Sequence, residues 1–285
     1  MSTNEVRAGQ FFAATIGIAI ARGWYEVGNN NSERMAELRS IVEGIHEFPN
    51  SIELLPAERT PLDGYAEWAA SYDAENPMIT AEARVVLPLL KPHVGEGVVA
   101  LDAGCGTGRH ASFLVANGCS TIGVDQSVAM LEKARATVPS ARFLEGELEN
   151  LPLADKSVDL AVASLALCHL PDPTTGVIEF ARVTRPGGTV VIADPHPVGG
   201  ITGGQAFYGG LRPGQPMPYV RNHHHLTSTW LRAFRSADLE VVDCIEVDID
   251  DELVKANPTS FFYPEATRAA IHGLPYLFVW ELRNR

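Results

Sequence analysis

The chain has 285 residues, of which 46% are hydrophobic and 20% are charged. These proportions are typical of a folded globular protein and exclude a fibrous or disordered one. The formal net charge is −13, from 22 basic and 35 acidic residues, and a field of that sign repels a polyphosphate backbone. The charge therefore disfavours a nucleic-acid partner and favours a small substrate that is neutral or cationic.

Four cysteines lie at positions 105, 119, 168 and 244 without a CxxC pair, a usage typical of a reducing compartment. The apolar run Phe11–Ala21 is too short to cross a bilayer, and no basic cluster precedes it. We therefore expect a cytoplasmic protein without a membrane partner, in which this run lies in a buried helix.

Helical patterns occupy the first 95 residues, at 5–25, 32–48, 60–73 and 80–91. Thr60 and Pro61 are a typical start for the third of these helices. We predict that residues 1–95 form a helical cap that covers the substrate, and that residues 96–285 form the main domain.

From residue 98 onward short apolar strands alternate with helices. Strands are expected at 98–101, 121–124, 141–144, 158–163 and 189–193, with helices at 108–117, 127–137 and 173–184. Such alternation predicts βαβ units and a parallel sheet, hence an α/β domain. A helix at 227–237 and strands at 239–247 and 276–282 complete the pattern.

One segment of the main domain, residues 197–225, has a different composition. Its first part, 197–221, holds seven glycines and four prolines. We expect a lid over the substrate, and an ordinary flexible insertion is the alternative interpretation.

A glycine-rich loop, Asp102–Gly108, follows the first strand of the main domain. It has the spacing GxGxG, but Arg109 stands where the dinucleotide fingerprint GxGxxG has its third glycine. The loop thus favours a nucleoside cofactor that approaches bare backbone, and a tight turn without ligand is the alternative. Asp125 ends the next strand, where a carboxylate can accept both hydroxyls of a ribose or lie on a helix dipole.

These residues resemble the class I S-adenosylmethionine-dependent methyltransferases, especially the small-molecule branch related to ubiquinone and menaquinone biosynthetic enzymes. The likeness covers residues 98–195, and its further motifs are Gly123–Ser127, Gly146–Leu153, Ser157–Leu160, Cys168–Asp172 and Arg185–Thr189. The resemblance implies a Rossmann-like, doubly wound sheet of seven strands, mostly parallel with an antiparallel last strand. It also implies S-adenosylmethionine as cofactor and S-adenosylhomocysteine as its product.

The resemblance also implies which positions bind the cofactor: Tyr72, Asp102, Ala103, Gly104, Cys105, Gly106, Asp125, Gln126, Met130, Glu147, Leu148 and Ser164. The loop from Asp102 to Gly106 would hold the methionine part and Asp125 the ribose, with Gln126 and Met130 around ribose and adenine. Glu147, where the family usually has Asp, would reach the adenine amino group, and Leu148 would offer its backbone amide. Ser164 would lie near the amino-acid end, and Tyr72 would cover the cofactor.

Methyl transfer is a displacement at a sulfonium methyl, so alignment is essential and a base is optional. Three histidines are candidates for a base or substrate contact: His169, His196 and His224. His169 lies at one of the two positions where the family has a pair of histidines. The other position is occupied by Cys168 in this chain. A packing role for His169 is the alternative. The tract His223–His225 is not expected to bind a metal, because consecutive residues point in different directions and no Cys or carboxylate lies at ligand spacing.

The sequence thus predicts a methyltransferase that modifies oxygen or nitrogen on a small, specialised metabolite in an aromatic-lined pocket. Carbon methylation of a quinone or isoprenoid precursor is one alternative. A reaction other than methylation, such as cyclisation, is another, whereas Arg109 disfavours a nicotinamide-dependent oxidoreductase. We expect a monomer or a homodimer.

Overall fold

The computed structural model describes residues 6–25, 30–210 and 214–285. It divides into two compact units, each built from three stretches of chain. The accessory unit comprises Met1–Glu58, Phe207–Tyr219 and Asp248–Pro275, and the sheet unit comprises Arg59–Ala206, Val220–Val247 and Tyr276–Arg285. The first boundary thus falls after residue 58, whereas the sequence predicted one after residue 95.

The sheet unit contains seven strands in the order β10-β11-β7-β6-β3-β4-β5. Their bounds are β3 Val99–Ala103, β4 Ser120–Asp125, β5 Arg142–Glu145, β6 Val158–Ser164, β7 Thr184–Pro195, β10 Leu239–Asp248 and β11 Pro275–Asn284. Strands β3 to β7 pair in parallel, and β11 pairs antiparallel with β7. The predicted doubly wound sheet, mostly parallel with an antiparallel last strand, is confirmed.

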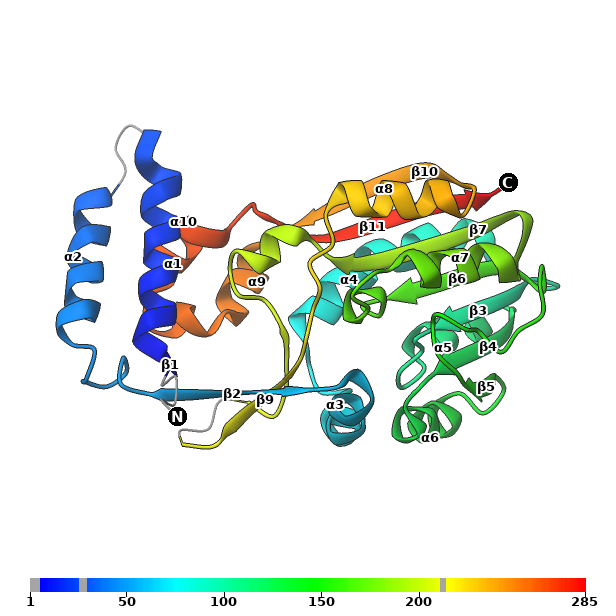
Figure 1. Ribbon diagram of the computed structural model, residues 1–285, viewed down its shortest axis with the longest axis horizontal. Helices are drawn as coiled ribbons and strands as arrows, with labels where there is room; N and C mark the ends of the chain where they lie inside the picture. The colour runs from blue at the N-terminus through cyan, green and yellow to red at the C-terminus, as the bar shows by residue number, and fades with distance from the viewer. Residues whose placement is uncertain (1–5, 26–29, 211–213) are drawn as a thin grey trace. The chain divides into compact units, whose positions relative to one another are not determined.

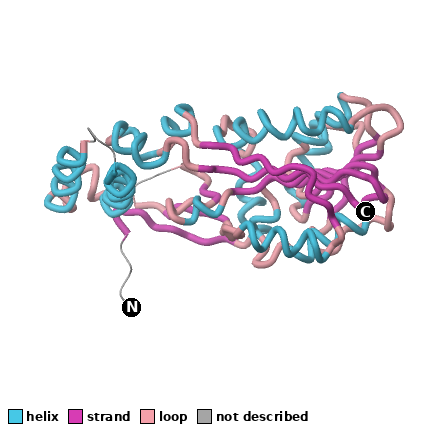
Figure 2. Tube along the Cα trace, turned by 90° about the horizontal axis from the view of Figure 1, so that it is seen from above, coloured by secondary structure: helices cyan, strands magenta, loops and turns pink. Residues whose placement is uncertain are grey.

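Helices cover both faces of this sheet, and Figure 2 shows its strands between them. The helices of the sheet unit are α3 Pro61–Trp68, α4 Pro77–Leu90, α5 Arg109–Ala116, α6 Val128–Thr137, α7 Thr174–Val183 and α8 Thr227–Ser236. Val86 and Leu90 of α4 and Leu114 of α5 pack on one face, with no exposed surface. Phe180 of α7 and Trp230 of α8 pack on the other. Burial of such large apolar side chains stabilises the sheet unit by about 1.5–3 kcal/mol each.

The accessory unit combines helices with a small sheet of order β1-β2-β9-β8 (Figure 1). Its elements are β1 Val6–Arg7, α1 Ala8–Arg22, α2 Asn31–Glu43, β2 Glu53–Arg59, β8 Ala206–Phe207, β9 Pro216–Val220, α9 Asp251–Ala256 and α10 Pro264–Ile271. Phe12 and Ile16 of α1 are buried against Ile41 of α2 and Ala266 of α10. The predicted helix over residues 5–25 is present as α1, but it begins at Ala8 because Val6 and Arg7 form β1, and residue 5 lies outside the described residues.

Strand β2 is an element that the sequence did not predict, because its residues ELLPAER carry a proline and three charges. It lies between β1 and β9 in the small sheet, with Val6 of β1 opposite Leu54. Strands β8 and β9 lie in the predicted lid, whose residues 211–213 lie outside the described residues. The predicted helix over 32–48 ends earlier, at Glu43, and Gly44 follows as its C-cap.

Over the described ranges, none of the helices has both the length and the apolar composition needed to cross a membrane.

Candidate functional site

The loop between β3 and α5 brings bare backbone to the carboxyl end of the sheet. Gly104 has φ +69°, and a Cβ there would lie 2.6 Å from the Cβ of Ala166. Gly106 has φ +52°, in the left-handed region that glycine adopts without strain. The loop is therefore a cradle that a side chain at Gly104 would fill.

Two carboxylates hold this cradle in place. Asp102 is buried and accepts a hydrogen bond of 2.8 Å from the Ala111 N–H, which ties the loop to α5. Asp125, at the end of β4, accepts 2.8 Å bonds from the Gly106 and Ser127 N–H groups. Burial raises the pKa of Asp125, opposed by these N–H donors. Each carboxylate oxygen of Asp125 has further lone pairs that can accept a ribose hydroxyl.

The cradle opens into a cavity of about 280 Å³ in the sheet unit. Its walls contain Pro61, Tyr65, Tyr72, Gly104, Gly106, Asp125, Gln126, Gly146, Glu147, Leu148, Glu149, Ser164, Leu165, Ala166, His169 and Leu170. The cavity thus brings together most of the residues predicted for a cofactor site, with His169. Four other predicted residues are buried rather than lining it: Asp102, Ala103, Cys105 and Met130.

A buried carboxylate outside the cavity positions one of its walls. Glu82, on α4, has no exposed surface and accepts a 2.7 Å hydrogen bond from the Ser164 hydroxyl. It also contacts Arg109 at 2.5 Å and His110 at 3.0 Å. Burial opposes its ionisation, but the hydrogen bond and charge of His110, the charge of Arg109 and the Ser164 hydroxyl together lower the pKa of Glu82 to about 2. Glu82 is not among the residues predicted from the sequence, where its only signal is an acid in an apolar helix.

An aromatic group lines the same cavity. Tyr65 stacks on Trp68 with ring centroids 5.7 Å apart and meets the edge of Tyr72. Its hydroxyl lies 2.7 Å from His169 Nε2, and His169 Nδ1 lies 2.8 Å from the Arg221 carbonyl oxygen. Burial lowers the pKa of His169 to about 4. The sequence analysis predicted an aromatic-lined pocket with Tyr72 over the cofactor, but not the pairing of Tyr65 with His169, which are 104 residues apart.

The other two candidate histidines are not among the residues that line the cavity. His196 Nδ1 accepts a 3.2 Å hydrogen bond from the Val198 N–H, and its Nε2 lies 3.4 Å from Glu246. Its ring also packs on Phe278, with centroids 4.2 Å apart. His224 Nε2 contacts the Gly204 carbonyl oxygen at 2.8 Å. Across the described parts of the chain, no cluster of three or more His, Cys, Asp or Glu side chains could hold a metal ion.

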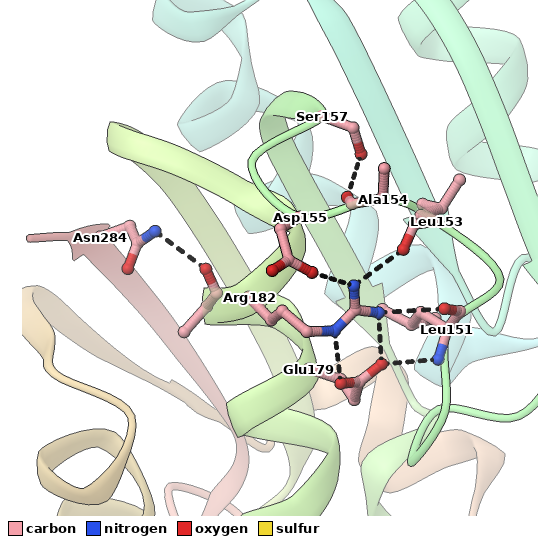
Figure 3. Close-up of polar contacts among 9 residues, drawn as sticks. Leu151, Leu153, Ala154, Asp155, Ser157, Glu179, Arg182 and Asn284 are labelled. Carbon is pink, nitrogen blue, oxygen red and sulfur yellow. Dashed lines mark hydrogen bonds and ion pairs between the residues drawn. The ribbon is translucent and has the colours of Figure 1, made fainter.

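The segment that follows Glu147 and Leu148 is clamped to α7 (Figure 3). Arg182 makes two 2.7 Å hydrogen bonds to the Glu179 carboxylate and donates to the carbonyl oxygens of Leu151 and Leu153. Glu179 in turn accepts from the Leu151 N–H at 2.8 Å. This Arg182–Glu179 clamp holds the end of the wall on which the adenine contacts are predicted.

Comparisons with known proteins agree with this geometry. Residues 101–192 match the family model described as a methyltransferase domain. Over 125 residues the chain is 36% identical to a malonyl-[acyl-carrier protein] O-methyltransferase of Pectobacterium atrosepticum, covering 44% of this chain and 49% of that protein. Over 154 residues it is 32% identical to a demethylmenaquinone methyltransferase of Paenarthrobacter aurescens, covering 52% and 59%. The chain spans about half the length of the curated relatives it matches.

A solved S-adenosylmethionine-dependent methyltransferase from Mesorhizobium loti has the same fold, with a TM-score of 0.54 and 25% identity over 78% of this chain and 99% of that one. Fold, glycine cradle and carboxylate thus define a class I methyltransferase domain of the Rossmann-like type. Residues 101–192 therefore form a methyltransferase domain, and its fold is that of a solved S-adenosylmethionine-dependent methyltransferase.

Proposed function

We propose that the chain transfers a methyl group from S-adenosylmethionine to oxygen or nitrogen of a small molecule. One observation carries the proposal: a single cavity is lined by the glycine cradle and Asp125, and also by Tyr65 and His169. The first set fits a nucleoside cofactor, and the second offers polar groups to a methyl acceptor. A cavity with both can hold the two reactants side by side.

The residues present fit the cofactor. Gly104 and Gly106 would let its methionine part approach bare backbone, and the Asp125 carboxylate would accept its ribose hydroxyls. Glu147 and Leu148 would face the adenine, and Tyr72 would cover the cofactor. When bound, S-adenosylmethionine supplies an electrophilic methyl group on a positively charged sulfur. The protein's contribution is to align the acceptor with that methyl, an effect of roughly 7–11 kcal/mol in well-oriented reactions.

The proposed substrate is a small specialised metabolite that is neutral or cationic, and the proposed setting is the cytoplasm. Glu149, an acid in the cavity walls without an assigned cofactor contact, and the absence of Lys and Arg from the described wall residues support this choice of charge. His169 is the candidate for substrate contact that lines the cavity. We also keep as predictions the catalytic roles of His196 and His224, the substrate-covering cap and the lid at 197–225. The choice between a monomer and a homodimer stays a prediction as well.

Cofactor binding is the first test. We expect S-adenosylmethionine and S-adenosylhomocysteine to raise the melting temperature, since a ligand at 100 times its Kd stabilises by about 2.7 kcal/mol. NAD should have no such effect. Asp125→Ala should weaken the calorimetric affinity for both compounds about tenfold or more, because a charge-assisted hydrogen bond contributes roughly 1.5–3 kcal/mol. Glu132→Ala, on the exposed side of α6, is the matched control. A folded protein that binds neither compound would contradict the proposal.

The likeness to a demethylmenaquinone methyltransferase favours a second candidate function, carbon methylation of a quinone precursor. A screen that measures S-adenosylhomocysteine release from phenols, amines and quinols would find acceptors for either function. NMR of the isolated products then distinguishes methyl groups on oxygen or nitrogen from those on carbon.

A further inference from the structure

The hydrogen bonds around His169 have a direction that the chemistry of the groups determines. The Arg221 backbone carbonyl can only accept, so the hydrogen between it and His169 Nδ1 belongs to the ring. Burial lowers the pKa of His169 to about 4, so the ring is neutral at pH 7 and carries one N–H. His169 Nε2 is then a bare lone pair.

The hydrogen bond between Tyr65 and His169 therefore also has a determined direction. The Tyr65 hydroxyl lies 2.7 Å from His169 Nε2, and a bare nitrogen can only accept, so Tyr65 donates. A hydroxyl has one hydrogen, and Tyr65 uses it in the hydrogen bond to His169. The Tyr65 oxygen therefore has only lone pairs to offer to the cavity that it lines.

The charges of the cavity point to the same kind of ligand. None of the described residues in its walls is Lys or Arg, whereas Asp125, Glu147 and Glu149 are acids. A carboxylate placed beside the Tyr65 oxygen would meet lone pairs instead of a donor, and a buried charge without a partner is strongly disfavoured. An O–H or N–H group would make a hydrogen bond.

We propose that Tyr65, oriented by His169, is a specificity-determining residue that selects a methyl acceptor with an O–H or N–H and rejects a carboxylate. The inference rests on the proposed function and narrows its substrate class. The substrate class proposed here thus differs from that of the relative named as a malonyl-[acyl-carrier protein] O-methyltransferase.

The tautomer of His169 tests the orientation of the pair without any substrate. Two-bond ¹H–¹⁵N spectra of the full chain, with the His169 signals assigned by their loss in His169→Gln, should show a neutral ring protonated on Nδ1 at pH 7. Protonation on Nε2 would reverse the direction of the Tyr65 contact and overturn the proposal.

Three small probes test the selectivity on protein saturated with S-adenosylhomocysteine: phenol, aniline and benzoate. Phenol and aniline should shift the His169 signals saturably, and benzoate should need at least tenfold higher concentrations. Tyr65→Phe should remove this discrimination between the probes while keeping the ring stack on Trp68. Tyr25, which is 91% exposed, provides the control: Tyr25→Phe should discriminate as the wild type does.

Absence of saturable shifts from phenol and aniline, preferred binding of benzoate, or unchanged discrimination in Tyr65→Phe would each overturn the proposal. Calorimetry with S-adenosylhomocysteine separates this failure from failure of the proposed function. If the cofactor product binds and the probes show no preference, only the role of Tyr65 is wrong. If the cofactor product does not bind, the proposed function is wrong as well.

Discussion

Glu82 carries a buried negative charge that three neighbours make favourable. Its carboxylate faces Ser164 of the cavity wall together with Arg109 and His110 at the start of α5. Removing one member of a buried ionic group leaves the others without compensation, at a typical cost of 3–5 kcal/mol. A residue that does not line the cavity thus determines where one of its walls lies.

We predict that Glu82→Gln destabilises the protein at neutral pH and that the effect depends on pH. The folded-state pKa of about 2 lies below the ordinary value of 4.5. The ionised carboxylate therefore contributes stability above pH 4.5, about 3 kcal/mol from the size of the shift. This contribution is lost as the pH falls from about 4.5 to 2.

Urea unfolding at pH 7, 4 and 3 checks this prediction. The difference in unfolding free energy between wild type and Glu82→Gln should be largest at pH 7 and shrink at pH 3, with Glu132→Gln as the control for an exposed acid. A difference that is the same at pH 7 and pH 3 would show that the Glu82 charge is not the cause.

At the scale of elements, the loop between β3 and α5 is the part of the site that the sequence predicts most directly. The sequence predicts its glycines, but Gly104 is required because Ala166, on the loop after β6, leaves no room for a Cβ. These two strands are neighbours in the sheet, with Ala103 opposite Ala163, so their loops meet. The parallel sheet therefore explains why a glycine motif and a distant residue share one cavity.

Gly104→Ala should lower stability by about 1–3 kcal/mol, because the new Cβ would clash with Ala166 and φ is +69°. The affinity for S-adenosylhomocysteine should fall at least tenfold in the same variant. Gly95→Ala is the matched control, since a Cβ there meets nothing within 4 Å. Thermal unfolding and calorimetry measure both effects. Normal affinity for S-adenosylhomocysteine in Gly104→Ala would contradict the role of the glycine cradle in cofactor binding.

Arg182→Lys tests the clamp between α7 and the segment after Leu148 (Figure 3). Lysine keeps the charge but cannot reproduce the planar fork that binds Glu179 through two parallel bonds. We expect a loss of about 1–3 kcal/mol in unfolding free energy. Arg185→Lys, with a side chain 46% exposed, should lose less than about 1 kcal/mol. Equal losses of unfolding free energy in the two variants would show that the Arg182–Glu179 clamp stabilises the protein no more than an exposed ion pair does.

At the scale of the whole molecule, a net charge of −13 acts on any partner that approaches from solution. Polyanions are repelled at distances up to the Debye length, about 10 Å at 0.1 M salt. The charge bears on the choice of partner, and the fold is determined by other forces.

We therefore expect no binding of labelled duplex DNA or transfer RNA in fluorescence anisotropy at low salt, where electrostatic attraction would be strongest. The result should be the same with S-adenosylhomocysteine present. Saturable binding that weakens as salt is added would reveal a basic surface and contradict the expected class of substrate.

The sequence by itself determined the α/β pattern, the glycine cradle and the carboxylate of Asp125, because these depend on local periodicity and on residues close together in the chain. The tertiary structure decided which predicted residues share a cavity, separating His169 from His196 and His224. It also revealed Glu82, the Tyr65–His169 pair and strand β2. The physical reason is that hydrogen bonds and strand pairs between distant segments leave no periodic signal. Strand β2 pairs with β1 and β9, and the Arg221 carbonyl determines the direction of the hydrogen bonds of His169.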